Sequence, residues 1–233
     1  MPDITLPIAD GSTARAFLAR PARDSSAPGL ILFQEAYGVN AHIRDLAGRF
    51  ASEGYVVIAP EMFHRTADPG FEAGYGDFES VRPHVAALTP DGITDDAVAA
   101  HEFLVRDEGA DSGRIAAVGY CMGGRCAWLA NAVLPLRAAV SYYGGGIAPA
   151  LLDRAKELQA PHLFFWGGKD THITPAHRAA IIDAVRAAGK VYVNVEMSAA
   201  DHGFFCDQRP SYDADSAAEA WVLTREFFRR NLT

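Results

Sequence analysis

The sequence predicts an α/β domain with a mostly parallel central sheet and helices on both of its faces. Short apolar runs without polar alternation recur along the chain, which is typical of strands buried on both sides. Amphipathic segments of helical length separate these runs, and glycine or proline stands at most of the boundaries. A repeated order of buried strand, helix and buried strand favours parallel pairing with helices packed against both faces.

The first third of the chain is expected to form an N-terminal hairpin followed by a strand, a helix and a strand. The turn signal Asp10-Gly11 separates strand-like runs over 4–8 and 14–19. Next we expect a buried strand over 29–34, an amphipathic helix over 42–53 ended by Gly54, and a buried strand over 55–59 stopped by Pro60.

The remaining elements continue the alternation as far as the C-terminus. Residues 61–90, rich in glycine, histidine and aromatic residues, are the least regular part, and whether they cover a site is left open. After them we expect helices over 91–108, 124–133, 175–188 and 214–229, and strands over 114–118, 138–143, 161–166 and 191–197. Pro175 suits the first turn of its helix. With no repeat or linker, we expect a single domain over 1–233.

Composition narrows the function classes. A formal net charge of −8 without a Lys/Arg cluster argues against nucleic acid and anionic membranes as partners. The absence of an apolar run of bilayer length and of signal-peptide features predicts a cytoplasmic protein. The three cysteines, an odd and low number, do not indicate a disulfide framework.

The segment Gly119-Tyr120-Cys121-Met122-Gly123-Gly124 follows a buried apolar run and carries the strongest functional signal. It matches the G-x-S-x-G nucleophile elbow, with sulfur in place of the serine oxygen. The small flanking residues are needed because the incoming strand and the outgoing helix nearly touch. We therefore predict that Cys121 is a nucleophile at a helix N-terminus, where the helix dipole favours a thiolate.

A cysteine nucleophile needs a base, and the base needs a carboxylate that orients it. Cys121, Asp170 and His202 each follow a predicted strand, so one edge of a parallel sheet can bring them together. Their order along the chain is that of the α/β-hydrolase triad. His172 is the rival base and Asp201 the rival carboxylate, and we favour His202 and Asp170 over them.

A carboxylate at the end of a buried strand, Glu35, needs a partner or a function. Either Glu35 forms a salt bridge with an arginine, or it lies beside Cys121 and accepts its proton or tunes its pKa. In the second case, the backbone N–H groups of Ala36 and Met122 would form an oxyanion hole.

These residues resemble the dienelactone hydrolase family of the α/β-hydrolase fold, over nearly the whole chain. The motifs that match are Gln34-Glu35-x-x-Gly38-Val39-Asn40, Gly119-x-Cys121-x-Gly123-Gly124, Gly167-x-x-Asp170 and His202-Gly203-Phe204. The resemblance implies a Cys121–His202–Asp170 triad, with Ala36 and Met122 as oxyanion donors. It also implies that Glu35 keeps Cys121 as a thiol at rest and takes its proton when substrate arrives. The prototype reaction that the resemblance implies is hydrolysis of an unsaturated lactone that carries a carboxylate. For this chain we expect hydrolysis of small carboxylic esters or lactones, with no cofactor and no metal.

The chain departs from the family pattern where an arginine, four residues after the histidine, holds the substrate carboxylate. Cys206 stands there, so we expect a preference for neutral esters or lactones. Arg82 and Arg65 are the cationic candidates in the irregular segment. Tyr37, Tyr143 and Phe204, near predicted strand ends, are the candidate apolar contacts.

Two other functions and one other site remain open. The same thiolate could attack the phosphorus of a neutral phosphate triester, which would make the protein a promiscuous phosphotriesterase. A redox-sensing module using Cys121 and Cys126 is disfavoured, because five helical residues rotate Cys126 off the face of Cys121. A metal site from His162, His172 and His177 fits no usual zinc spacing. The expected partner is a small-molecule ester, and a homodimer is compatible with the sequence.

Overall fold

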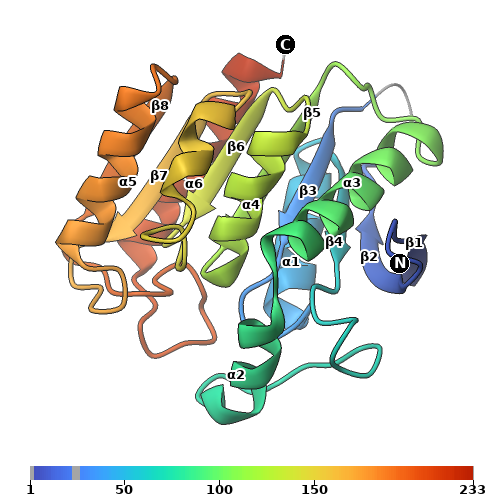
Figure 1. Cartoon of the computed structure of the whole chain (residues 1–233), viewed down its shortest axis with the longest axis horizontal. Helices are drawn as coiled ribbons and strands as arrows, with labels where there is room; N and C mark the ends of the chain where they lie inside the picture. The colour runs from blue at the N-terminus through green and yellow to red at the C-terminus, as the bar shows by residue number, and fades with distance from the viewer. Residues whose placement is uncertain (1–2, 23–26, 233) are drawn as a thin grey trace.

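The computed structural model describes residues 3–22 and 27–232, and these residues build a sheet with the strand order β1-β2-β4-β3-β5-β6-β7-β8 (Figure 1). The strands are β1 (Asp3–Pro7), β2 (Thr13–Ala19), β3 (Gly29–Phe33), β4 (Val56–Pro60), β5 (Ile115–Tyr120), β6 (Ala138–Tyr142), β7 (His162–Gly167) and β8 (Tyr192–Met197). β1 and β2 form the expected hairpin, and β2 pairs antiparallel with β4. The other pairs are parallel, so the predicted sheet is confirmed.

Helices cover both faces of the sheet. They are α1 (Ala41–Ser52), α2 (Phe78–Ala87), α3 (Pro90–Arg106), α4 (Met122–Val133), α5 (Pro175–Ala187) and α6 (Ala214–Asn231), with a 3-10 helix over Leu152–Glu157. Figure 1 shows α3, α4 and α5 in front of the sheet and α1 and α6 behind it. On the far side the ring of Phe50 in α1 packs 4.6 Å from that of Trp221 in α6. The layered α/β architecture is therefore as expected.

The strand register places the carboxyl ends of the central strands at one edge. Phe33 at the end of β3 lies opposite Gly119 of β5, and Gly167 of β7 lies opposite Met197 of β8. β3, β5, β6 and β7 are buried along their whole length, and so is most of α4. Most of the turns and loops that carry the candidate functional residues are thus attached to fully buried strands. Buried strands are the parts of a fold that open least often.

The segment over 61–90 contains a helix that the sequence did not predict. α2 begins at Phe78 after Asp77, whose carboxylate accepts a hydrogen bond from Ser80 N. The helix encloses Pro83 and buries just Val81, so neither an apolar stripe nor an uninterrupted run of helix formers marks it. The 3-10 helix over 152–157 was missed as well. Within the described ranges, no helix combines the length and apolar character needed to cross a bilayer.

Candidate active site

Cys121 occupies the turn between β5 and α4 in a strained backbone conformation, with φ 53° and ψ −119°. The turn needs glycines because the two elements meet there. A Cβ on Gly119 would collide with the carbonyl oxygen of Gly123, and a Cβ on Gly123 would lie 2.5 Å from the carbonyl oxygens of Phe33 and Gln34. Strain of this kind costs about 1–3 kcal/mol and is concentrated at functional sites. The structure therefore forms the predicted elbow and leaves the Cys121 side chain partly exposed.

The structure brings Cys121, His202 and Asp170 into one line of contacts. Nε2 of His202 lies 3.1 Å from Sγ of Cys121, and Nδ1 of His202 lies 2.8 Å from Oδ2 of Asp170. The second carboxylate oxygen of Asp170 accepts hydrogen bonds from the backbone N–H groups of His172 and Ile173, at 2.8 and 3.0 Å. Cys121 directly follows β5, and Asp170 and His202 lie in the loops after β7 and β8, so the parallel strands bring all three residues to one edge of the sheet.

Electrostatics favour a charged imidazole next to the sulfur. Burial would lower the pKa of His202, but the Cys121 sulfur and the Asp170 carboxylate outweigh it and raise the pKa to about 10. Burial would likewise raise the pKa of Asp170, yet its hydrogen bond with His202 prevails and lowers that pKa. An imidazolium in contact with sulfur stabilises a thiolate, the form of cysteine that acts as a nucleophile.

The two rival residues contact the triad from outside. The ring of His172 stacks edge-on against that of His202, with centroids 5.3 Å apart, and its backbone N–H binds Asp170. Asp201 accepts a hydrogen bond from the backbone N–H of His202 at 2.6 Å and does not reach the imidazole nitrogens by any hydrogen bond seen in the described chain. The geometry therefore favours His202 as the base and Asp170 as its partner.

Glu35 is fully buried and is bound by two side chains from other loops. The hydroxyl of Tyr75 donates to Oε2 at 2.9 Å, and Nη1 of Arg209 lies 3.3 Å from Oε1. Of the two expectations for Glu35, the structure contains the salt bridge with an arginine. Within the described residues, no hydrogen bond joins its carboxylate to Cys121.

The N–H groups expected to form the oxyanion hole belong to Ala36, which follows β3, and Met122, the first residue of α4. Both residues line the same cavity as Cys121 and His202. In the described part of the chain, neither backbone N–H donates a hydrogen bond to another residue. Both donors are thus available to a ligand in the cavity.

The cavity at Cys121 has a volume of about 560 Å³, within the usual range for a small-molecule site. Its walls come from the loop after β3, from α2, from the start of α4 and from the loops after β6, β7 and β8. The lining residues are Ala36, Tyr37, Phe78, Val85, Cys121, Met122, Arg125, Gly145, Gly146, His172, Ile173, His202 and Arg209. The helix α2, from the segment predicted as irregular, therefore forms part of the wall.

The structure places some of the predicted substrate contacts on the cavity wall and others away from it. Tyr37 lines the cavity. Arg82 does not, because it lies on the exposed side of α2, paired with Glu79. Tyr143 and Phe204 are fully buried behind the site, where the ring of Tyr143 packs 5.1 Å from that of His202. The ring of Phe204 packs 5.3 Å from that of Tyr143, so neither of these two rings lines the cavity.

Two arginines that the sequence analysis did not single out line the cavity. Arg209 lies in the loop after β8, and its guanidinium is 6.0 Å from the ring of Tyr37. Arg125 lies one helical turn after Cys121, donates to the carbonyl oxygen of Val85 at 3.2 Å, and forms no salt bridge within the described ranges. Helical spacing could have found Arg125, since residues four apart share a face. Arg65, the other cationic candidate, is bound by Asp10 and Asp96.

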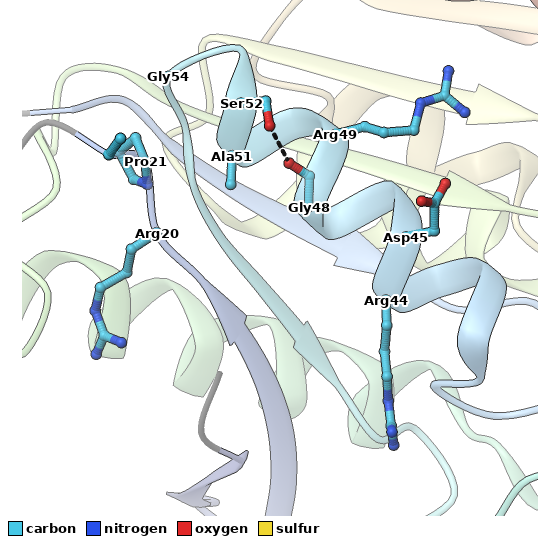
Figure 2. A pocket seen from close by; sticks show the side chains of 10 residues that line it. Arg20, Pro21, Arg44, Asp45, Gly48, Arg49, Ala51, Ser52 and Gly54 are labelled. Carbon is cyan, nitrogen blue, oxygen red and sulfur yellow. Dashed lines mark hydrogen bonds between the residues drawn. The ribbon is translucent and has the colours of Figure 1, made fainter.

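A larger hollow of about 830 Å³ lies along α1 and contains none of these residues (Figure 2). Its arginines have partners: Arg20 pairs with Glu108 at 2.5 Å, Arg44 pairs with Glu72 at 2.9 Å, and Arg49 stacks on Trp221 at 4.3 Å. Among the described residues that line this hollow there is no cysteine or histidine, and the Ser52 hydroxyl donates to the carbonyl oxygen of Gly48 at 2.9 Å, so size alone does not make it a functional site.

Comparison with known proteins places the whole chain in one family. Residues 14–232 match the model of the dienelactone hydrolase family. A Synechocystis protein named as a carboxymethylenebutenolidase is 34% identical, over 93% of this chain and 91% of the relative. An Escherichia coli K12 protein of the same name is 35% identical, over 94% of this chain and 83% of the relative.

Solved structures agree with this placement. A Klebsiella pneumoniae protein described as a dienelactone hydrolase superposes with a TM-score of 0.90 at 33% identity, over 98% of both chains. A dienelactone hydrolase-like promiscuous phosphotriesterase from metagenomic libraries has a TM-score of 0.84 at 22% identity, over 100% of this chain and 99% of the other. At that identity the second likeness shows a common fold.

Proposed function

Since this chain belongs to the dienelactone hydrolase family, we propose that it hydrolyses carboxylic esters or lactones through a thioester on Cys121. The observation that supports the proposal most directly is the continuous contact from Cys121 through His202 to Asp170, with an Sγ–Nε2 distance of 3.1 Å. The proposed nucleophile is the thiolate of Cys121, formed when its proton passes to the adjoining imidazole of His202. The adjoining cavity gives a substrate carbonyl access to it.

In the first half of the reaction, the thiolate of Cys121 attacks the carbonyl carbon. The carbonyl oxygen gains the negative charge and is held by the N–H groups of Ala36 and Met122. The C–O bond then breaks, and the imidazolium of His202 gives its proton to the leaving alcohol. The acyl group remains on sulfur as a thioester.

In the second half, the neutral imidazole of His202 takes a proton from a water molecule as that water attacks the thioester. The carboxylic acid leaves, and the sulfur departs as a thiolate beside the imidazolium that has just formed. Asp170 stabilises that positive charge throughout and fixes the ring, because two backbone N–H groups hold its other oxygen.

The substrate class can be refined from the two guanidinium groups of the cavity. The expectation of a neutral ester depended on Cys206 replacing the arginine that holds a carboxylate. Arg209 and Arg125 both line the cavity, and Glu35 neutralises Arg209. Arg125 has no such partner in the described chain. We therefore propose that esters or lactones with an anionic group are accepted, with that group held at Arg125.

A neutral phosphate triester is the second candidate substrate. The structural neighbour described as a promiscuous phosphotriesterase supports it, together with a thiolate placed beside two N–H donors. Attack at phosphorus would leave a phosphoryl group on Cys121 in place of an acyl group.

One experiment tests both candidates. The protein is incubated with an aryl ester or a paraoxon-type triester, quenched, and analysed by peptide mass spectrometry. An acyl or a phosphoryl mass increment on the Cys121 peptide is expected, together with loss of turnover in Cys121→Ala. Cys126→Ser is the matched control, because Cys126 lies buried in α4, donates a hydrogen bond to the Met122 carbonyl oxygen and does not line the cavity. Turnover retained by Cys121→Ala would exclude the mechanism.

A further inference from the structure

A second group of potential ligand atoms lies beside the active site. It consists of Glu35 after β3, His42 in the first turn of α1 and Cys206 in the loop after β8. Each residue offers one donor atom, and the three donor atoms lie within 4.8 Å of one another. The side chains are exposed by 0%, 3% and 0%, so the group is enclosed by protein.

The imidazole of His42 is not satisfied by the fold. Its Nε2 atom is buried and has no hydrogen-bond partner among the described residues, while its Nδ1 atom lies 3.8 Å from Oδ1 of Asp207. A buried polar atom without a partner costs about 1–3 kcal/mol and calls for an explanation. Histidines that bind metals usually direct the second nitrogen toward a carboxylate, and Asp207 is in that position.

The donor set is one that a particular class of metal ion prefers. Thiolate, imidazole and carboxylate are the three ligand types of protein zinc sites, and three protein ligands leave a fourth position for water. The donor atoms of a tetrahedral Zn²⁺ site lie roughly 3.5 Å from one another. Side-chain rotations that move each donor atom by about 1 Å would therefore bring all three within bonding distance of one ion.

We propose that Glu35, His42 and Cys206 form a binding site for Zn²⁺, separate from the cavity at Cys121. The thiol of Cys206 gives up its proton to solvent when its sulfur bonds to the ion. The hydroxyl of Tyr75, which already donates to Glu35 at 2.9 Å, orients the carboxylate from outside. None of the three ligands lines the cavity at Cys121.

An approach to this site exists from another side. A cavity of about 340 Å³ reaches His42 between α1, α6 and the loop after β8. The carboxylates of Asp45 and Asp207 and the guanidinium of Arg49 also line it, which leaves the lining with a net negative charge. Negative side chains at the mouth of a narrow cavity raise the local concentration of cations.

The ion would compete with Arg209 for Glu35. Nη1 of Arg209 lies 3.3 Å from Oε1 of Glu35, and a cation bound to that carboxylate is repelled by the guanidinium. Removing the guanidinium should therefore strengthen metal binding, an effect that a purely structural role of Cys206 and His42 would not produce.

The test uses Cys121→Ala, which removes the competing thiolate of the active site and makes binding independent of catalysis. Co²⁺ is titrated while the cobalt–thiolate charge-transfer absorption is followed, and Zn²⁺ is then used to displace it. We expect one equivalent of Co²⁺ with thiolate absorption. In the Cys121→Ala background, Cys126→Ser should keep that absorption, Cys206→Ser should lose it, and Arg209→Met should bind Zn²⁺ several-fold more tightly.

Two further variants keep the proposal testable if Cys206→Ser fails to fold. In the same background, His42→Gln retains the thiol and should weaken Zn²⁺ binding by 100-fold or more, whereas Asp207→Asn should weaken it about tenfold. Zn²⁺ should also raise the Tm of Cys121→Ala but not that of the His42→Gln variant. The proposal is overturned if Cys121→Ala shows no thiolate absorption with Co²⁺. It is equally overturned if the absorption survives Cys206→Ser, or if Zn²⁺ stabilises the His42→Gln variant as strongly.

Discussion

Replacing Asp170 with asparagine should invert the hydrogen-bond roles of His202 without changing the size of any side chain. In the native protein, one oxygen of Asp170 accepts two backbone N–H groups at 2.8 and 3.0 Å. In Asp170→Asn the amide oxygen must occupy that place, so the NH₂ group faces Nδ1 of His202. Nδ1 then has to accept a hydrogen bond, and the proton moves to Nε2, the atom that faces the sulfur of Cys121.

The size of the effect follows from two losses. A hydrogen bond between charged groups contributes about 1.5–3 kcal/mol, so losing it lowers the rate about 10- to 150-fold. The wrong tautomer of His202 cannot take a proton from water, which adds to that loss. Since the corresponding change in a serine triad costs about 10⁴-fold, we expect kcat/KM of Asp170→Asn to fall about 10³- to 10⁴-fold.

The assay measures kcat/KM for an aryl ester and the rate at which Cys121 is alkylated by iodoacetamide at neutral pH. Both should fall in Asp170→Asn, because a neutral imidazole no longer stabilises the thiolate. Asp201→Asn is the matched control: the side chain of Asp201 accepts just the backbone N–H of His202, and an amide oxygen can do the same. The reasoning is refuted if Asp170→Asn stays within tenfold of the native enzyme, or if Asp201→Asn loses as much.

Three more outcomes are expected. The folded protein raises the pKa of His202 from 6.5 to about 10, so protonation of His202 stabilises the fold fully below pH 6.5, and this contribution disappears as pH rises through 10. The Tm of the native protein should therefore exceed that of His202→Gln most at pH 6 and least at pH 10. Thermal unfolding followed by circular dichroism measures both Tm values, and a Tm difference that grows with pH would contradict this expectation. Gly119→Ala places a methyl group against the backbone of Gly123 and should cost 3 kcal/mol or more of unfolding free energy in urea, whereas Gly145→Ala, which has open space at its Cβ position, should cost less than about 1 kcal/mol. Arg125→Gln should lower kcat/KM for a carboxylate-bearing ester about thirtyfold and that for its neutral methyl ester less than threefold, with Arg125→Lys in between; equal losses on both substrates would exclude the anionic subsite.

Residues at strand ends could be predicted because two independent patterns fix their positions. The apolar run before Cys121 defines where β5 ends, and the glycines around it define a turn with space for no side chain. The same reasoning places Asp170 and His202, because in a parallel sheet the carboxyl ends of strands share one edge. Strand periodicity and turn sterics therefore placed Cys121, Asp170 and His202 at one edge, whereas the preference over His172 and Asp201 also used the residue order of the α/β-hydrolase triad.

Residues in long loops could not be placed in the same way. Arg209 follows His202 by seven positions, and the chain between them turns at Gly203, with φ 78°, before the guanidinium packs back against that glycine. No periodicity fixes the register of such a segment. The arginine position examined in the sequence was therefore occupied by Cys206, while the cation that reaches the cavity lay three residues further on.

For the buried carboxylate of Glu35, the sequence predicts that a partner is needed but does not identify that partner. That a charge at the end of an apolar strand needs a partner follows from the cost of burying it. Which partner it has depends on Tyr75 and Arg209, from two loops separated by more than 130 residues of chain. Because Arg209 both pairs with Glu35 and lines the cavity at Cys121, a change at Arg209 alters the charge on the wall of that cavity. Sequence reasoning thus predicts that Glu35 needs a partner, whereas the packing of the two loops determines which partners it has.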